Sequence, residues 1–137
     1  MESLEGIADA DAVLGRPFPL PDVPLPLTRW VEVRRTGPGA EVEWNLDDTR
    51  PGRPGRLALY AAPADRGAAP DQLAPDAERT RTPQGWIVAR DPLPAAQDSL
   101  RPVLQVTWEH DGLALRLTAQ GPWELAAVLR IVGSLAR

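Results

Sequence analysis

The chain offers few side chains for nucleophilic or metal chemistry. It has one histidine, His110, and no cysteine among its 137 residues. A nucleophilic hydroxyl needs a base within hydrogen-bond reach, and the Asp-Gly pair after His110 places this imidazole in a predicted hairpin turn. Thiolate metal sites and sites with two histidines are excluded by the same counts. We therefore expect no catalytic residue, no metal site and no cofactor, and we interpret His110 as a solvated turn residue.

Carboxylates raise the alternative of acid–base catalysis, because the chain has 19 acidic residues. Glu41 and Glu43 alternate on one face of a predicted strand, where a hydrolase would need its carboxylates to face a cleft. Arginines flank this face, so we interpret the two glutamates as solvated and leave a carboxylate-based hydrolase as the minor alternative. Asp47 and Asp48 lack the spacing of a calcium loop and are better explained by a turn.

The basic residues are all arginine, which is typical of a GC-rich bacterial genome. The net charge of -4 argues against a nucleic-acid partner, because no large cluster opposes the overall sign. Arg50, Arg53 and Arg56 form a small basic group among glycines and prolines. They are candidates for holding an anion, and a solvated polar loop is the alternative interpretation.

Aromatic residues supply the other candidate binding side chains. Of the five tryptophans, three have the phase of core residues: Trp44, Trp108 and Trp123. Trp30 shares its strand face with charged residues, and we expect it to be buried under the proline-rich segment that precedes it. Alternatively, Trp30 lies on the outer face of the sheet beside Tyr60, and the two rings form an aromatic patch that a partner could bind. Trp86 is the remaining candidate.

The elements that must position these residues are mostly strands. Apolar and polar residues alternate in six segments: 30–35, 41–46, 56–62, 85–90, 103–109 and 113–119. Gly-containing turns join the first two and the last two segments as hairpins. This pattern predicts an antiparallel sheet of about six strands. Residues 63–83 are too long for a simple connector and too rich in proline for a long helix, so we interpret them as a mobile or a functional loop.

Two helices complete the prediction. Residues 8–15 are expected to form a short helix that begins at Asp9 and ends at Gly15. Prolines forbid a helix in 16–27, which should run extended. From Pro122 onward, an apolar stripe predicts a final helix that must pack on the open face of the sheet. The fold class is therefore α+β in one domain over 1–137, with a helix and proline-rich lead-in (1–27) before the sheet and covering helix (28–137).

Both ends of the chain resemble a known family. The segments ADADAVLGRPFPLPDVPLPL and LQVTWEHDGLALRLTAQGPWELAAVLRIVGSLAR are similar to DUF4367-type domains, small bacterial α+β modules of uncharacterised function. The middle agrees by strand order alone, and Leu115 or Leu117 stands where a tyrosine is expected. The resemblance implies a curved antiparallel sheet with a helix on one face, akin to lipoprotein-carrier half-barrels. It also implies an exported or anti-sigma-factor-associated setting, and it supplies no catalytic residues.

These observations predict a non-catalytic binding or sensing module, which docks a protein partner or a small apolar ligand between sheet and helix. A structural interaction domain of a larger assembly is the alternative. No apolar run is long enough to span a membrane, and residues 1–15 lack the pattern of a signal peptide. The resemblance favours an extracytoplasmic domain of a longer protein, whereas a native start at Met1 would favour the cytoplasm.

Overall fold

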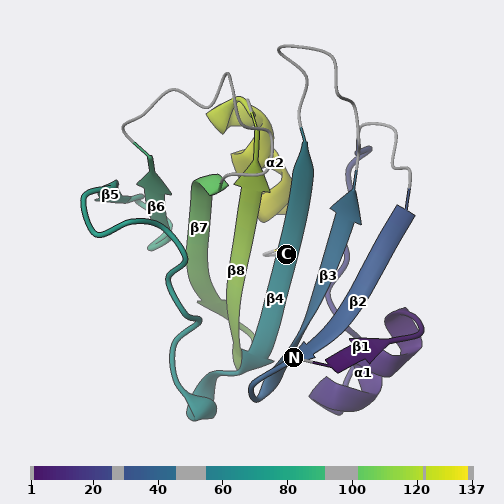
Figure 1. Ribbon diagram of the computed structural model, residues 1–137. Coiled ribbons are helices and arrows are strands. Elements are labelled where there is room, and N and C mark those ends of the chain that lie inside the picture. The colour runs from purple at the N-terminus through teal and green to yellow at the C-terminus, as the bar shows by residue number, and fades with distance from the viewer. Residues whose placement is uncertain (1, 26–29, 46–54, 92–101, 122, 136–137) are drawn as a thin grey trace.

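The computed structural model describes residues 2–25, 30–45, 55–91, 102–121 and 123–135, which form an α+β fold (Figure 1). Eight strands form an open antiparallel sheet. In the sequence, one helix lies between the first and second strands, and the other follows the last strand. The strands are β1 (Glu2–Leu4), β2 (Trp30–Thr36), β3 (Gly39–Asn45), β4 (Arg56–Pro63), β5 (Glu78–Arg81), β6 (Ile87–Arg90), β7 (Pro102–His110) and β8 (Leu113–Gln120). The helices are α1 (Ile7–Leu14), α2 (Leu125–Leu135) and a short 3-10 turn, η1 (Ala64–Arg66).

The order of the strands in the sheet is β1-β2-β3-β4-β8-β7-β6-β5. Two meanders of four strands therefore meet where β4 pairs with β8 at the centre of the sheet. The turn between β7 and β8 has positive φ at both Asp111 and Gly112, as a two-residue type I′ hairpin requires. The α+β class and both predicted hairpins are confirmed.

The six predicted strands are present, and the two additional strands lie at the edges of the sheet. β1 has three residues, and β5 exposes all four of its residues. Neither has an apolar alternation that the sequence could reveal, because an edge strand buries little. β5 also falls inside 63–83, which we interpreted as a loop.

The second helix begins at Leu125 rather than at Pro122, which is a correction to the sequence prediction. The carbonyl of Glu124 accepts hydrogen bonds from the amides of Ala127 and Val128, so the first helical turn closes there. Trp123 is buried before the helix starts, and its amide donates to the carbonyl of Gly121 in a separate tight turn.

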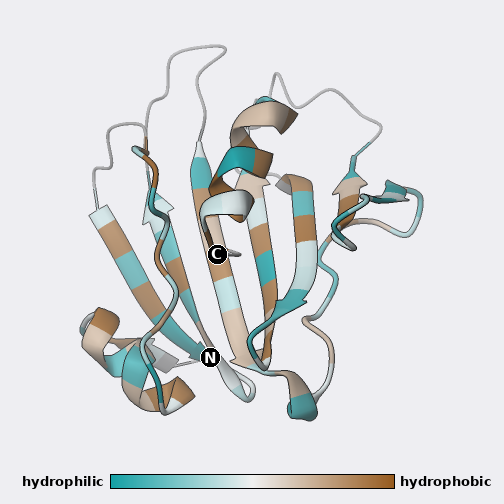
Figure 2. Cartoon of the chain, turned by 180° about the vertical axis from the view of Figure 1, so that it is seen from behind, coloured by the Kyte–Doolittle hydropathy of each residue, from teal (hydrophilic) through white to brown (hydrophobic). Residues whose placement is uncertain are grey.

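One face of the sheet is apolar and carries the main core. α1, the extended segment 16–25 and α2 lie over this face, as the view from behind shows (Figure 2). α2 buries four apolar side chains against it: Val128, Ile131, Val132 and Leu135. The predicted cover of the sheet by the final helix is therefore confirmed, and it shares that role with α1 and the proline-rich segment.

The proline-rich segment is fixed at both of its ends. Gly15 takes a left-handed φ of 70° that ends α1, and the amide of Phe18 then donates to Asp11 Oδ1 at 2.6 Å. The ring of Phe18 is buried in the core. Further along, the amide of Asp22 donates to Ser134 Oγ in α2 at 3.1 Å, which links the segment to the second helix.

Candidate functional site

The second face of the sheet is polar, and charged side chains on it are buried. Arg34 on β2 contacts Glu41 Oε1 at 2.6 Å and Glu43 Oε1 at 3.3 Å, both on β3. Arg116 on β8 contacts Glu41 Oε2 at 2.7 Å. Glu41 therefore joins two guanidinium groups from strands on either side of it. We call these four residues the ion-pair network.

The interpretation of Glu41 and Glu43 as solvated is wrong, because each residue is only 7% exposed. Burying a charge is tolerated when partners satisfy it, and here both carboxylates accept hydrogen bonds from arginine. Burial opposes protonation of Arg34, but the hydrogen bond and charge of Glu41 raise its pKa above the usual value. These oxygens are engaged with arginine, which supports a structural role for the network.

Residues 67–77, which we call the strap, run from η1 to the start of β5 and contact the network at Arg116. Arg116, which is 2% exposed, donates from Nη1 to the carbonyl of Pro70 at 2.8 Å. The amide of Gln72 donates to Gln105 Oε1 at 2.8 Å. Leu73 packs in a small apolar cluster with Ala77 and Ala89. The strap is therefore an ordered cover of the polar face, held mainly by hydrogen bonds.

An ion pair joins the strap to β5. Arg79 Nε lies 2.9 Å from Asp71 Oδ2, and the other nitrogens of Arg79 donate to strap carbonyls. This hydrogen bond from Arg79 lowers the pKa of Asp71, despite the opposing effect of partial burial.

Trp30 lies on the polar face with 42% of its surface exposed, so the expectation of core burial is wrong. The proline-rich segment passes over the opposite face of the sheet and leaves this ring uncovered. Tyr60 is on the same face as Trp30 by strand register, but it is 2% exposed and lies under the guanidinium of Arg116 at 4.9 Å. The two rings therefore do not form the joint aromatic patch that we considered.

Trp86 is half-buried and packs against the main core. A Cβ atom at Gly133 of α2 would meet its ring at 4.0 Å, so this ring lies beside the second helix. Arg50, Arg53, Asp47 and Asp48 lie outside the described residues. Within the described ranges, no group of three acidic or histidine side chains is arranged to hold a metal ion, and neither α-helix is long and apolar enough to cross a membrane.

The outer edge of β2 is the most exposed apolar part of the sheet. β1 pairs only with Val33–Arg35, and Trp30–Glu32 extend beyond it with β3 as their one neighbour among the described strands. Val31 is 44% exposed and points to the apolar face, opposite to Trp30. A hollow of about 230 Å³ lies beside this edge, lined by Ser3, Leu4 and residues 31–34. We call Trp30–Glu32 the open edge.

The sequence contained part of the signal for these features. The alternation of Trp30 with Glu32 and Arg34 was the signal for an outer face, although we expected Trp30 to be buried. The burial of Glu41 was missed because its partner Arg116 lies 75 positions away in the sequence. No match to this chain was found among protein-family models, curated proteins or solved structures, so the resemblance to DUF4367-type domains remains a prediction.

Proposed function

We propose that this chain is a non-catalytic docking module, which receives an extended segment of a partner protein along the open edge. The observation that carries the proposal is the combined exposure of Trp30 and Val31 on an edge strand whose neighbour, β1, stops short of them. Unpaired strand edges are the usual templates for adding a strand from another chain.

Strand addition would use both the backbone and the side chains of the open edge. The partner's main chain would continue the line of β1 and pair with the outer N–H and C=O groups of Trp30–Glu32. Successive side chains of an added strand point to opposite faces of the sheet. One set would contact Trp30 on the polar face, and the next would contact Val31 on the apolar face.

Charge indicates the chemistry of that partner. Near the open edge, Arg34 contacts three carboxylates, those of Glu32, Glu41 and Glu43. Arg116 and Arg56 lie on the same face but farther from the edge, on β8 and β4. The Glu32 side chain is 52% exposed and lies at the edge. A basic side chain of the partner would therefore pair with Glu32 and contact the Trp30 ring through a cation–π interaction. The expected partner segment alternates basic and apolar residues.

A second copy of this chain fits the open edge less well. The chain carries a net charge of -4, so two copies repel. A stable interface between folded proteins buries about 1,200–2,000 Å². The three residues of the open edge would bury far less area, because β1 already pairs with Val33–Arg35 on the same edge of β2.

A small apolar ligand, the other expectation from the sequence, would lie between the sheet and α2. Neither of the two hollows described here is lined by α2. The exposed edge of β2 therefore favours an extended peptide, and an apolar molecule under the helix stays the alternative.

The test is isothermal titration calorimetry of the chain with end-capped heptapeptides that alternate arginine and valine. We expect a Kd of about 1 mM or below, weakened at least about tenfold in the double variant Trp30→Ser/Val31→Lys. Lysine on an edge strand is a natural block to strand pairing. The same peptide with glutamate in place of arginine should also bind at least about tenfold more weakly.

Leu20→Ser is the matched control, because Leu20 is 46% exposed in the proline-rich segment, outside the open edge. It removes a similar apolar side chain without touching the open edge, and it should leave the Kd unchanged. Absence of binding by the arginine peptide, equal binding by the double variant, or an equal loss in Leu20→Ser would refute the proposal.

A further inference from the structure

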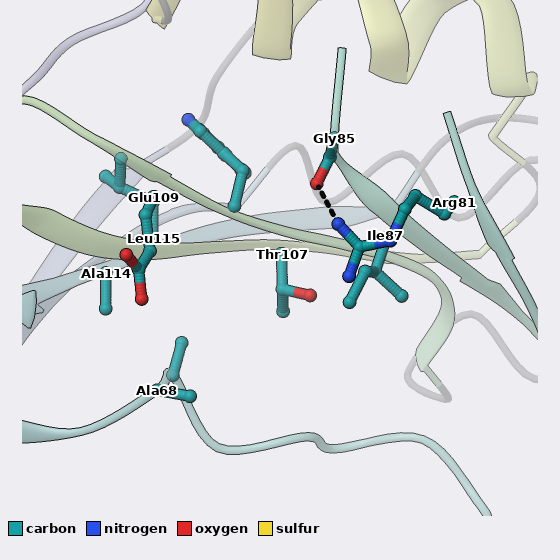
Figure 3. Close-up of a pocket in the computed structure, with 10 residues that line it drawn as sticks. Ala68, Arg81, Gly85, Ile87, Thr107, Glu109, Ala114 and Leu115 are labelled. Atoms are coloured by element: carbon teal, nitrogen blue, oxygen red, sulfur yellow. Dashed lines mark hydrogen bonds between the residues drawn. The ribbon is translucent and has the colours of Figure 1, made fainter. Parts of the chain in front are cut away.

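A second hollow, distinct from the open edge, lies on the polar face between the start of the strap and strands β5 to β8 (Figure 3). Its volume is about 350 Å³, which is within the range of small-molecule sites, about 300–1,000 Å³. Ala68 of the strap faces it from one side, and Thr107 of β7 points into it from the sheet. We call this hollow the strap cleft.

Two opposite charges line the strap cleft without a charged partner among the described residues. Arg81 on β5 donates only to the carbonyl of Gly85, at a long 3.5 Å. Glu109 on β7 makes no hydrogen bond or ion pair within the same set. Arg81 thus differs from Arg34, Arg79 and Arg116, whose guanidinium groups each form an ion pair with a carboxylate.

The register of the strands fixes how far apart the Cα atoms of Arg81 and Glu109 are. Arg81 pairs with Ile87, and Ile87 pairs with Thr107, so the three side chains form a row across β5, β6 and β7. Glu109 lies two residues beyond Thr107 on the same face of β7. With neighbouring strands about 4.8 Å apart and a rise of about 3.3 Å per residue, the Cα atoms of Arg81 and Glu109 are about 12 Å apart.

We propose that the strap cleft binds a zwitterionic ligand of about the length of a tripeptide. Its carboxylate would accept hydrogen bonds from the Arg81 guanidinium, and its ammonium group would donate to the Glu109 carboxylate. Three extended residues span about 10 Å, which is close to the distance of about 12 Å between the Cα atoms of Arg81 and Glu109. Ile87, 37% exposed between them, supplies an apolar surface for the central side chain, and the Thr107 hydroxyl supplies a central hydrogen-bonding group.

The probe is the tripeptide Ala-Leu-Ala with free termini, titrated into the full chain and followed by NMR of the backbone amides. We expect saturable shifts at β5, β6 and β7 with a Kd of about 1 mM or below. The N-acetylated form and the C-terminal amide should each bind at least about tenfold more weakly, because each lacks one of the two charges.

Variants test the assignment of each end. Arg81→Glu and Glu109→Lys should each weaken the free tripeptide at least about tenfold, and Ala68→Trp should do so by filling the cleft. Both charged residues and Ala68 are exposed, so folding should survive. Arg90→Glu and Glu124→Lys are the matched controls, since both residues are exposed and neither lines the cleft.

Three results would overturn this inference: no binding of the free tripeptide, equal binding of the free and capped forms, or equal losses in the matched controls. The heptapeptides that test the open edge are capped at both ends and lack this pair of terminal charges. Failure at one site therefore leaves the other test intact.

Discussion

Replacing Arg116 by methionine should lower the free energy of unfolding by about 3 kcal/mol. The guanidinium is 2% exposed, donates to Glu41 at 2.7 Å and to the Pro70 carbonyl at 2.8 Å, and lies over the Tyr60 ring. Removing one partner of a buried ion pair costs about 3–5 kcal/mol, because the other charge stays buried. Arg34 still contacts Glu41 at 2.6 Å, so the lower end of this range applies.

The assay is urea unfolding followed by tryptophan fluorescence, with thermal melting as a second readout. At about 4 °C per kcal/mol for a domain of this size, Tm should fall by about 12 °C. The matched control is Arg81→Met, which removes an exposed arginine from the same face and should change stability by no more than about 0.5 kcal/mol.

A double-mutant cycle with Glu41→Gln separates the ion pair from the loss of packing. We expect the two substitutions to be non-additive by about 1.5 kcal/mol or more, as for residues in direct contact. A loss below about 1 kcal/mol for Arg116→Met, or a loss equal to that of Arg81→Met, would refute the reasoning. It would mean that the strap does not keep water away from the ion-pair network.

Three further predictions concern the cover of the sheet, the open edge and pH. A chain ending at Gly121 lacks α2 and should aggregate or lose cooperative melting, and a soluble, cooperative melt would contradict this role of the helix. Trp30→Ala should cost less than about 1 kcal/mol in a urea titration, because the ring is 42% exposed, whereas a loss above about 3 kcal/mol would place it in the core. The hydrogen bond from Arg79 lowers the pKa of Asp71 below its ordinary 3.8, so its stabilisation is present above that pH and is lost as pH falls through the folded-state pKa. Asp71→Asn should therefore be less stable than the natural chain at neutral pH, and the difference should vanish once the pH is below the folded-state pKa; a difference that stays constant with pH would contradict this.

The fold was largely predictable because alternation and turn residues act locally. The Asp111-Gly112 turn and the flanking alternation define β7 and β8, and both are central strands that bury the residues they alternate. β1 and β5 lack such a pattern because each pairs with only one neighbour and buries little. The start of α2 was placed too early because proline is a common first residue of helices, whereas the helix here begins beyond Glu124.

The candidate sites were less predictable because they depend on contacts between distant segments. Trp30 was selected from the sequence, but its exposure depends on which face the proline-rich segment covers. Tyr60 was selected for the same patch, and its burial depends on Arg116 and the strap. Arg81 and Glu109 were not selected, because only the register of β5, β6 and β7 places them at one cleft.

The most direct test of the proposed docking function is amide hydrogen exchange of the full chain with and without the capped arginine–valine heptapeptide. Strand addition at the open edge predicts slower exchange concentrated at those amides of Trp30–Glu32 that point away from β3, with little change at β5 to β8. Protection that is absent from these amides, or that is centred on the strap cleft, would contradict docking at the edge of β2.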